Sequence, residues 1–153
     1  MNRELFVVAG QKPWVFDAFG RFGQGICVST LRGISQLQAG SWVFFIHFSD
    51  RVPSDLLEKH VCIGFHMTAL PFGRGGSPLQ NLIKRGFQTT MLTAYKMTEE
   101  LDAGPVYTIR ELALSGTAQL VYERASDLAI SMAWDIFNRR PVPVNQEGEP
   151  IVF

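Results

Sequence analysis

The chain has 153 residues, 46% of them hydrophobic, and fourteen Lys and Arg residues balance fourteen Asp and Glu residues. This size and composition fit one domain with one buried core, so we expect residues 1–153 to form a single domain. The balanced charge argues against a nucleic-acid substrate, because the chain has no net positive field that would gather a polyanion.

The two cysteines and the N-terminus indicate where the protein works. Cys27 and Cys62 lie outside the spacings of a zinc site or a disulfide framework, so we expect them to be reduced and buried, as in a cytosolic protein. The N-terminus lacks the apolar core of a signal peptide, and no apolar run reaches the roughly 18–20 residues that span a bilayer. We expect a soluble, cytoplasmic protein with no membrane partner and no metal.

The first half of the chain alternates between strand and helix patterns. Continuous apolar runs predict buried parallel strands, and prolines near a first turn mark two of the helices. We predict strands over residues 5–9, 42–46 and 61–63 with a weaker one over 26–29, and helices over 13–19, over 31–37 and after Pro53. This order predicts an open α/β sheet with parallel pairs.

The second half is predicted to hold two helices and a hairpin of strands. Ser77 as N-cap and Gly86 after the last turn bound a helix, and Thr117 caps a long helix that runs to about Phe137. Residues 89–97 and 105–114 predict two strands joined by a loop over 98–104. The Pro-rich tail after Arg140 cannot be helical, and we expect its apolar end, 151–153, to lie against the domain.

Ligands of open α/β sheets bind beyond the carboxyl ends of the strands, where three loops concentrate polar residues beside glycines. These loops cover residues 47–53, 64–77 and 98–104. The second holds His66, which is either a histidine satisfied by the backbone or a base or electrostatic catalyst near neutral pH. The third holds Asp102, which either shapes a turn or orients a histidine. Arg74 precedes a helix N-terminus that suits an anion, but a solvated arginine is equally consistent with the pattern.

These letters resemble a known family. Gly64-Phe65-His66, Thr68-Ala69-Leu70-Pro71, Arg74-Gly75 and Leu101-Asp102-Ala103-Gly104 are similar, in order and spacing, to the signature of folate-dependent formyltransferases: Asn-x-His, Ser-Leu-Leu-Pro, Arg-Gly and Leu-Asp-x-Gly. The resemblance covers roughly residues 44–114. It implies an open, mostly parallel Rossmann-like sheet with flanking helices and a long C-terminal helix. It also implies that residues 1–153 are one formyltransferase-like catalytic domain, shortened in its N-terminal half.

The resemblance assigns roles to individual residues. It implies that an amine attacks the formyl carbon of 10-formyltetrahydrofolate, with His66 beside that carbon and Asp102 orienting it directly or through water. The donor is expected against Asp50, Arg51 and Val52, with Leu101 on its other side. Arg74 and Gly75 are expected to bind the second substrate.

One position departs from the family pattern. Gly64 stands where the pattern has an asparagine whose amide faces the formyl oxygen, and loss of such a donor elsewhere costs about 10²–10³ in rate. Thr68 is our candidate replacement, because side chains two residues apart in an extended segment project to the same side. A backbone N–H or a water is an alternative donor, and a folate-binding pseudoenzyme is the non-catalytic alternative.

Two further sequence segments indicate which amine accepts the formyl group. Phe-His-Met-Thr and Gly-Arg-Gly-Gly-Ser-Pro-Leu-Gln-Asn-Leu-Ile resemble the small amino-sugar formyltransferases of the pseudaminic-acid type, which implies a nucleotide-linked 4-amino sugar as substrate. Another small amine is the alternative. Methionyl-tRNA is disfavoured, because that branch resembles a two-domain protein with a basic surface. A homodimer is compatible with the resemblance.

Overall fold

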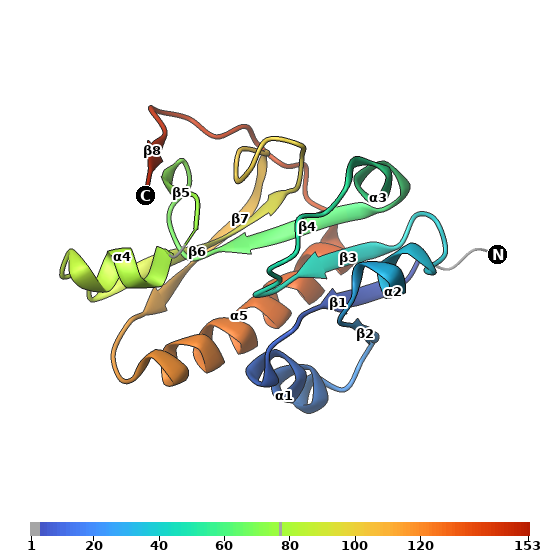
Figure 1. The fold of residues 1–153 in the computed structure, drawn as a ribbon, viewed down its shortest axis with the longest axis horizontal. Helices are drawn as coiled ribbons and strands as arrows, with labels where there is room; N and C mark the ends of the chain where they lie inside the picture. Colours follow the sequence, from blue (N-terminus) through green and yellow to red (C-terminus); the bar gives the residue numbers. More distant parts are fainter. Residues whose placement is uncertain (1–3, 77) are drawn as a thin grey trace.

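The computed structural model describes residues 4–76 and 78–153, so the predicted capping position Ser77 lies outside the described residues. Its main sheet has six strands in the order β2-β1-β3-β4-β6-β7 (Figure 1). The pairs among β2, β1, β3 and β4 are parallel, whereas β6 and β7 run antiparallel to their neighbours. The strands of this sheet are β1 (Phe6–Ala9), β2 (Ile26–Val28), β3 (Trp42–Phe45), β4 (Val61–His66), β6 (Thr89–Lys96) and β7 (Val106–Ala113).

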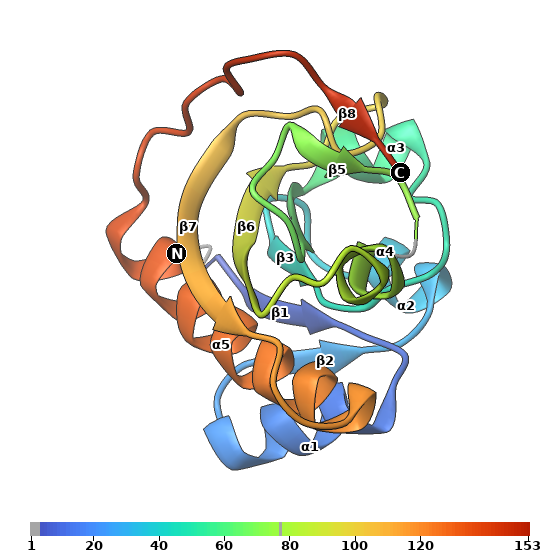
Figure 2. The ribbon, with the colours of Figure 1, turned by 90° about the vertical axis from the view of Figure 1, so that its left-hand side faces the viewer.

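Helices cover both faces of this sheet, which confirms the expected open, mostly parallel α/β architecture with a long C-terminal helix. The longest helix, α5, lies along one face and packs against α1 (Figures 1 and 2). The five helices of the described chain are α1 (Pro13–Phe22), α2 (Leu31–Ser35), α3 (Ser54–Lys59), α4 (Pro78–Lys84) and α5 (Ala118–Arg139). Pro13 occupies the first turn of α1, and the Thr117 hydroxyl accepts a hydrogen bond from Leu120 N–H at the start of α5, both as predicted.

Alternation along the parallel strands divides the core between the two faces. Phe6 and Val8 of β1 belong to a large cluster under α1 and α5, while Val7 and Ala9 belong to a smaller cluster with Ile34 of α2 and others of α3. Cys62 lies in the smaller cluster, 2% exposed. Cys27 was expected to be buried but is only half-buried, because it lies on the edge strand β2.

Two features of the strands were not predicted. Strand β4 continues three residues beyond Ile63, since Gly64 to His66 pair with β6. A separate two-stranded sheet joins β5 (Phe72–Arg74) to β8 (Ile151–Val152) (Figure 2). Pairing of β8 with β5 confirms that the end of the tail lies against the domain, and Phe153 packs on Phe72 with ring centroids 5.2 Å apart.

Among the described residues, no helix is long and apolar enough to cross a membrane.

Candidate active site

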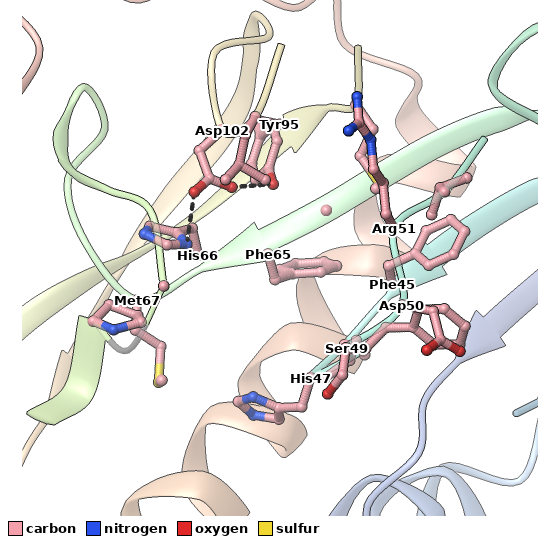
Figure 3. A pocket seen from close by; sticks show the side chains of 18 of the residues that line it. Phe45, His47, Ser49, Asp50, Arg51, Phe65, His66, Met67, Tyr95 and Asp102 are labelled. Carbon is pink, nitrogen blue, oxygen red and sulfur yellow. Dashed lines mark hydrogen bonds and ion pairs between the residues drawn. The ribbon is translucent and has the colours of Figure 1, made fainter. Parts of the chain in front are cut away.

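A cavity of about 1310 Å³ opens beyond the carboxyl ends of β3 and β4, where the topology predicts a ligand site. It is larger than the roughly 300–1,000 Å³ typical of pockets for one small ligand. Figure 3 shows His66, Asp102 and Tyr95 on one side of this cavity and Ser49, Asp50 and Arg51 on the other. All three predicted loops contribute to its wall, through residues 47–53, through residues that include Gly64, His66 and Gly75, and through residues that include Leu101 and Asp102.

His66 is the last residue of β4 and is only 8% exposed. Its Nε2 lies 2.7 Å from the carbonyl oxygen of Gly73, and because a carbonyl can only accept, this nitrogen carries a proton. Its Nδ1 faces Asp102 Oδ2 at 3.7 Å, beyond hydrogen-bonding distance but close enough for a carboxylate to stabilise a positive ring. Neutral His66 can therefore accept a proton only at Nδ1, beside that carboxylate.

Asp102 is 5% exposed and has a left-handed backbone, with φ of 54°. Three hydrogen bonds fix it. Its Oδ2 accepts from Gly75 N–H at 2.9 Å, its Oδ1 accepts from the Tyr95 hydroxyl at 2.7 Å, and its carbonyl oxygen accepts from Gln146 Nε2 at 2.9 Å. Gly75, expected to bind substrate, lines the cavity and is also the backbone support of this carboxylate. The loop after β6 is thus held in a conformation that would be strained on its own.

The loop between β3 and α3 forms the other side of the cavity. Val52 is buried, whereas Asp50 and Arg51 are exposed, and all three line the cavity, as does Leu101, which is 70% exposed. The side chain of Gln11, just past β1, binds this loop at two adjacent residues. It donates to Asp50 Oδ2 at 2.8 Å and accepts from Ser49 N–H at 2.9 Å.

His47 lines the same cavity but received no separate role from the sequence. Its φ is 48°, and its ring lies edge-on to Trp14 and Tyr122 with centroids 6.5 Å and 5.1 Å away. Burial, followed by the nearby charge of Lys12, lowers the pKa of His47 to about 4. His47 is therefore neutral at pH 7, and among the described residues its buried Nε2 has no hydrogen-bond partner.

Two expected site residues do not reach the cavity. Thr68 is fully buried and does not line the wall, because β4 ends at His66 and the alternation that would place both side chains on one side stops there. Arg74 lies on β5, where its Nη2 and Nε donate to Gln146 Oε1 at 2.9 Å and 3.3 Å. The guanidinium thus joins β5 to the tail instead of lining the cavity.

The structure adds a residue that the sequence did not point to. Tyr95 lies directly opposite Gly64 in the antiparallel pair of β4 and β6, lines the cavity and bonds to Asp102. A glycine inside a strand does signal a close neighbour. The sequence could not say which residue that neighbour is, because the register of β4 against β6 pairs positions that lie far apart in the chain.

No family model matches the chain. A methionyl-tRNA formyltransferase from Mycoplasma capricolum subsp. capricolum is 31% identical over 114 residues, which cover 69% of this chain and 36% of that protein. The solved methionyl-tRNA formyltransferase from Clostridium thermocellum is 35% identical, with a TM-score of 0.86, over 96% of this chain and 70% of that one. The chain belongs to the formyltransferase family.

A more distant formyltransferase shows the fold alone. The N-formyltransferase from Helicobacter canadensis, solved with folinic acid and dTDP-3-aminofucose, is 14% identical, with a TM-score of 0.75, over 99% of this chain and 71% of that one. The chain spans about a third of the length of the curated methionyl-tRNA formyltransferase it matches. Family membership and the expected formyltransferase fold are therefore confirmed.

Proposed function

We propose that the protein transfers the formyl group of 10-formyltetrahydrofolate to a primary amine, with residues 1–153 acting as one catalytic domain. The observation that carries this proposal is the buried pair of His66 and Asp102 on the wall of the cavity, in a chain that belongs to the formyltransferase family. The pair combines a proton acceptor with a carboxylate that stabilises the protonated ring. Formyl transfer to an amine needs such a proton acceptor.

The reaction can be followed atom by atom. The amine nitrogen bonds to the formyl carbon, and the formyl oxygen takes up the negative charge of the tetrahedral intermediate. His66 accepts the proton that the amine loses, at Nδ1 beside Asp102. The carbon then releases N10 of the folate, which takes up the proton held by His66, and the products are the N-formyl amine and tetrahydrofolate.

The donor has a natural place on the loop side of the cavity. Val52 and Leu101 offer apolar surface for a flat ring, and they come from the two loops that face each other across the site. Asp50 and Arg51 offer polar contacts at its edge, and Gln11 holds the Asp50 end of that loop in shape. We assign Asp50, Arg51, Val52 and Leu101 to donor binding.

For the acceptor we propose a nucleotide-linked 4-amino sugar of the pseudaminic-acid type. The cavity exceeds the volume typical for one small ligand, which favours two small substrates bound together. Lys12 and Arg51 are the Lys and Arg side chains on its wall within the described residues. Because Arg51 is assigned to the donor, Lys12 replaces Arg74 as the candidate for contact with an anionic carrier. The balanced charge of the chain suits such an acceptor.

Methionyl-tRNA is the second candidate acceptor. It is favoured by the identity to methionyl-tRNA formyltransferases, 31% over 114 residues and 35% over most of this chain. A tRNA acceptor would make activity fall steeply with salt, since each phosphate contact releases counterions. A nucleotide sugar, with few phosphates, would give a shallow dependence.

Steady-state assays separate these alternatives. Purified protein is given 10-formyltetrahydrofolate with a panel of UDP- and dTDP-linked amino sugars or with methionyl-tRNA, and the formylated product is measured by mass spectrometry at two salt concentrations. Turnover of a 4-amino sugar supports our acceptor, and turnover of methionyl-tRNA alone replaces it. Folate binding without turnover on any acceptor would contradict the enzyme proposal and indicate a folate-binding protein.

The pair of His66 and Asp102 is tested with the competent acceptor. We expect His66→Ala and Asp102→Ala each to lower kcat by about 10² or more, because each removes part of the proton-transfer apparatus. His60→Gln is the matched control, since His60 is buried but bonds to Ile34 O and does not line the cavity. Wild-type kcat in either alanine variant would remove that residue from the catalytic set.

A further inference from the structure

We propose that Tyr95 is a positioning residue for the pair of His66 and Asp102, and that the absence of a side chain at Gly64 is what admits it. The expected effects on kcat rest on the proposed function, whereas the contacts of Tyr95 are observed in the structure and do not depend on it. Tyr95 is 6% exposed, lines the cavity and comes from the neighbouring strand rather than from any of the three loops that the sequence singled out.

Tyr95 fits over Gly64 because position 64 has no side chain. Directly opposed residues of an antiparallel pair share one face of the sheet, and these two are partners in the register of β4 and β6. A Cβ at position 64 would lie 2.9 Å from both Cζ and the hydroxyl oxygen of Tyr95. Any side chain at position 64 would therefore displace the phenol, so the two positions are coupled.

The phenol of Tyr95 holds the carboxylate of Asp102. Its hydroxyl donates to Asp102 Oδ1 at 2.7 Å, while the other carboxylate oxygen accepts from Gly75 N–H and faces His66 Nδ1 (Figure 3). Burial, reinforced by the charge of Asp102 and the hydrogen bond, raises the pKa of Tyr95, so the phenol remains a proton donor throughout the working pH range. The carboxylate is thus fixed at both oxygens, and Oδ2 is turned to the histidine.

Tyr95 could either position Asp102 or only pack against the sheet, and these two roles depend on different parts of its side chain. An aromatic ring over a strand glycine also stabilises a sheet without any bearing on chemistry. Packing depends on the ring, which Tyr95→Phe keeps, whereas positioning depends on the hydroxyl, which Tyr95→Phe removes. In that variant Oδ1 of Asp102 loses its donor and the buried carboxylate can turn away from His66.

The experiment compares Tyr95→Phe with Tyr107→Phe, a matched control whose half-buried phenol on β7 does not line the cavity. We expect Tyr95→Phe to lower kcat by about 10- to 100-fold with little change in the KM for the folate donor, because a charged hydrogen bond is lost from the positioning of the pair. Tyr107→Phe should keep wild-type kcat. Wild-type kcat in Tyr95→Phe, or equal losses in both variants, would overturn the proposal.

The coupling to Gly64 is tested by a double-mutant cycle with Gly64→Ala. Alone, this change should lower kcat, because the added methyl group pushes the hydroxyl away from Asp102. On the Tyr95→Phe background it should cause little further loss of kcat, since that hydroxyl is already gone. Losses that multiply would mean that the two positions act independently and would overturn the coupling.

A readout that needs no acceptor keeps this test separate from the proposed function. The ring ¹⁵N signals of His66 report which nitrogen is protonated and are assigned with His66→Ala. We expect them to shift in Tyr95→Phe and to stay in place in Tyr107→Phe. Shifts in a protein that turns over no acceptor would sink the proposed function and leave the positioning intact, while unchanged His66 signals in Tyr95→Phe would overturn the positioning.

Discussion

His47 is a cavity residue whose environment differs strongly from that of a free side chain. It has a left-handed backbone, lies against two aromatic rings and has a pKa near 4 instead of 6.5. Such combinations gather at functional sites, where the rest of the structure supports a conformation that is unfavourable locally. The neutral ring also keeps a positive charge away from this part of the cavity.

The depressed pKa of His47 predicts a pH-dependent stability. Below pH 6.5 the unfolded chain binds a proton at His47 that the folded chain does not, so stability should fall as the pH drops from about 6.5 towards 4. Between pH 7 and pH 5, the titration of His47 should lower the free energy of unfolding by about 2 kcal/mol. Asparagine tolerates a left-handed backbone and does not titrate, so His47→Asn should lose about 2 kcal/mol less than the wild type over this interval.

Urea unfolding of both proteins at pH 7 and pH 5 measures this difference. His60, whose pKa is also lowered mainly by burial, is present in both proteins and cancels. An equal loss of stability in the two proteins would show that His47 is protonated in the folded state.

The two-stranded element of β5 and β8 bears on the site through Gln146. This side chain accepts from Arg74 of β5 and donates to the carbonyl oxygens of Asp102 and Gly104 at 2.9 Å each. One amide thus joins the tail, β5 and the loop that carries the carboxylate. The tail is therefore part of the support of the active site, although no residue of it lines the cavity.

Removal of this amide should affect turnover more than folding. In Gln146→Ala the loop over residues 98–104 loses two hydrogen bonds, and we expect kcat to fall by about tenfold while the Tm changes little, because the core is untouched. Gln119→Ala is the matched control, since Gln119 is exposed on α5 and bonds only to Glu123 among the described residues. Steady-state kinetics and thermal unfolding of the two variants test this prediction. Similar kcat values in both variants would contradict a role of Gln146 in supporting the active site.

For the molecule as a whole, stability depends on the sheet and its two clusters. Phe44 lies at the centre of the larger cluster, fully buried, with its ring 5.3 Å from that of Phe6 and 6.4 Å from that of Phe65. We expect Phe44→Ala to cost about 3–5 kcal/mol of unfolding free energy, the range for large cavities in cores. Phe16→Ala, at a 41% exposed position of α1, should cost much less.

Urea unfolding measures both costs. Activity of Phe44→Ala should follow its folded fraction, with kcat per folded molecule close to that of the wild type. A loss of kcat in fully folded Phe44→Ala would mean that the core sets the geometry of the site as well as its stability.

Much of this architecture could be predicted, because local patterns set it. Buried parallel strands such as β1 and β3 are apolar throughout, and Pro13 and Thr117 mark the starts of α1 and α5. The loops that line the cavity were also predicted, since they follow from the strand order. Pairings between distant segments were not: the length of β4, the β5–β8 sheet and the opposition of Gly64 and Tyr95 depend on contacts that neither segment encodes alone. The expectation for Thr68 extended the strand alternation beyond His66, where β4 ends, and Thr68 does not line the cavity.

The link from Gln146 to the loop of Asp102 has a consequence for how the protein is made. Ribosomes build a chain from its N-terminus, and domains can begin to fold while synthesis continues. All six strands of the main sheet precede residue 114, and α5, which completes the larger core cluster, ends at Arg139, so the core can be complete before residue 146 is made. The carboxylate loop cannot be fastened until residue 146 has emerged, some forty residues after the loop itself. A nascent chain could therefore complete its core shortly before the carboxylate loop of its active site is fixed.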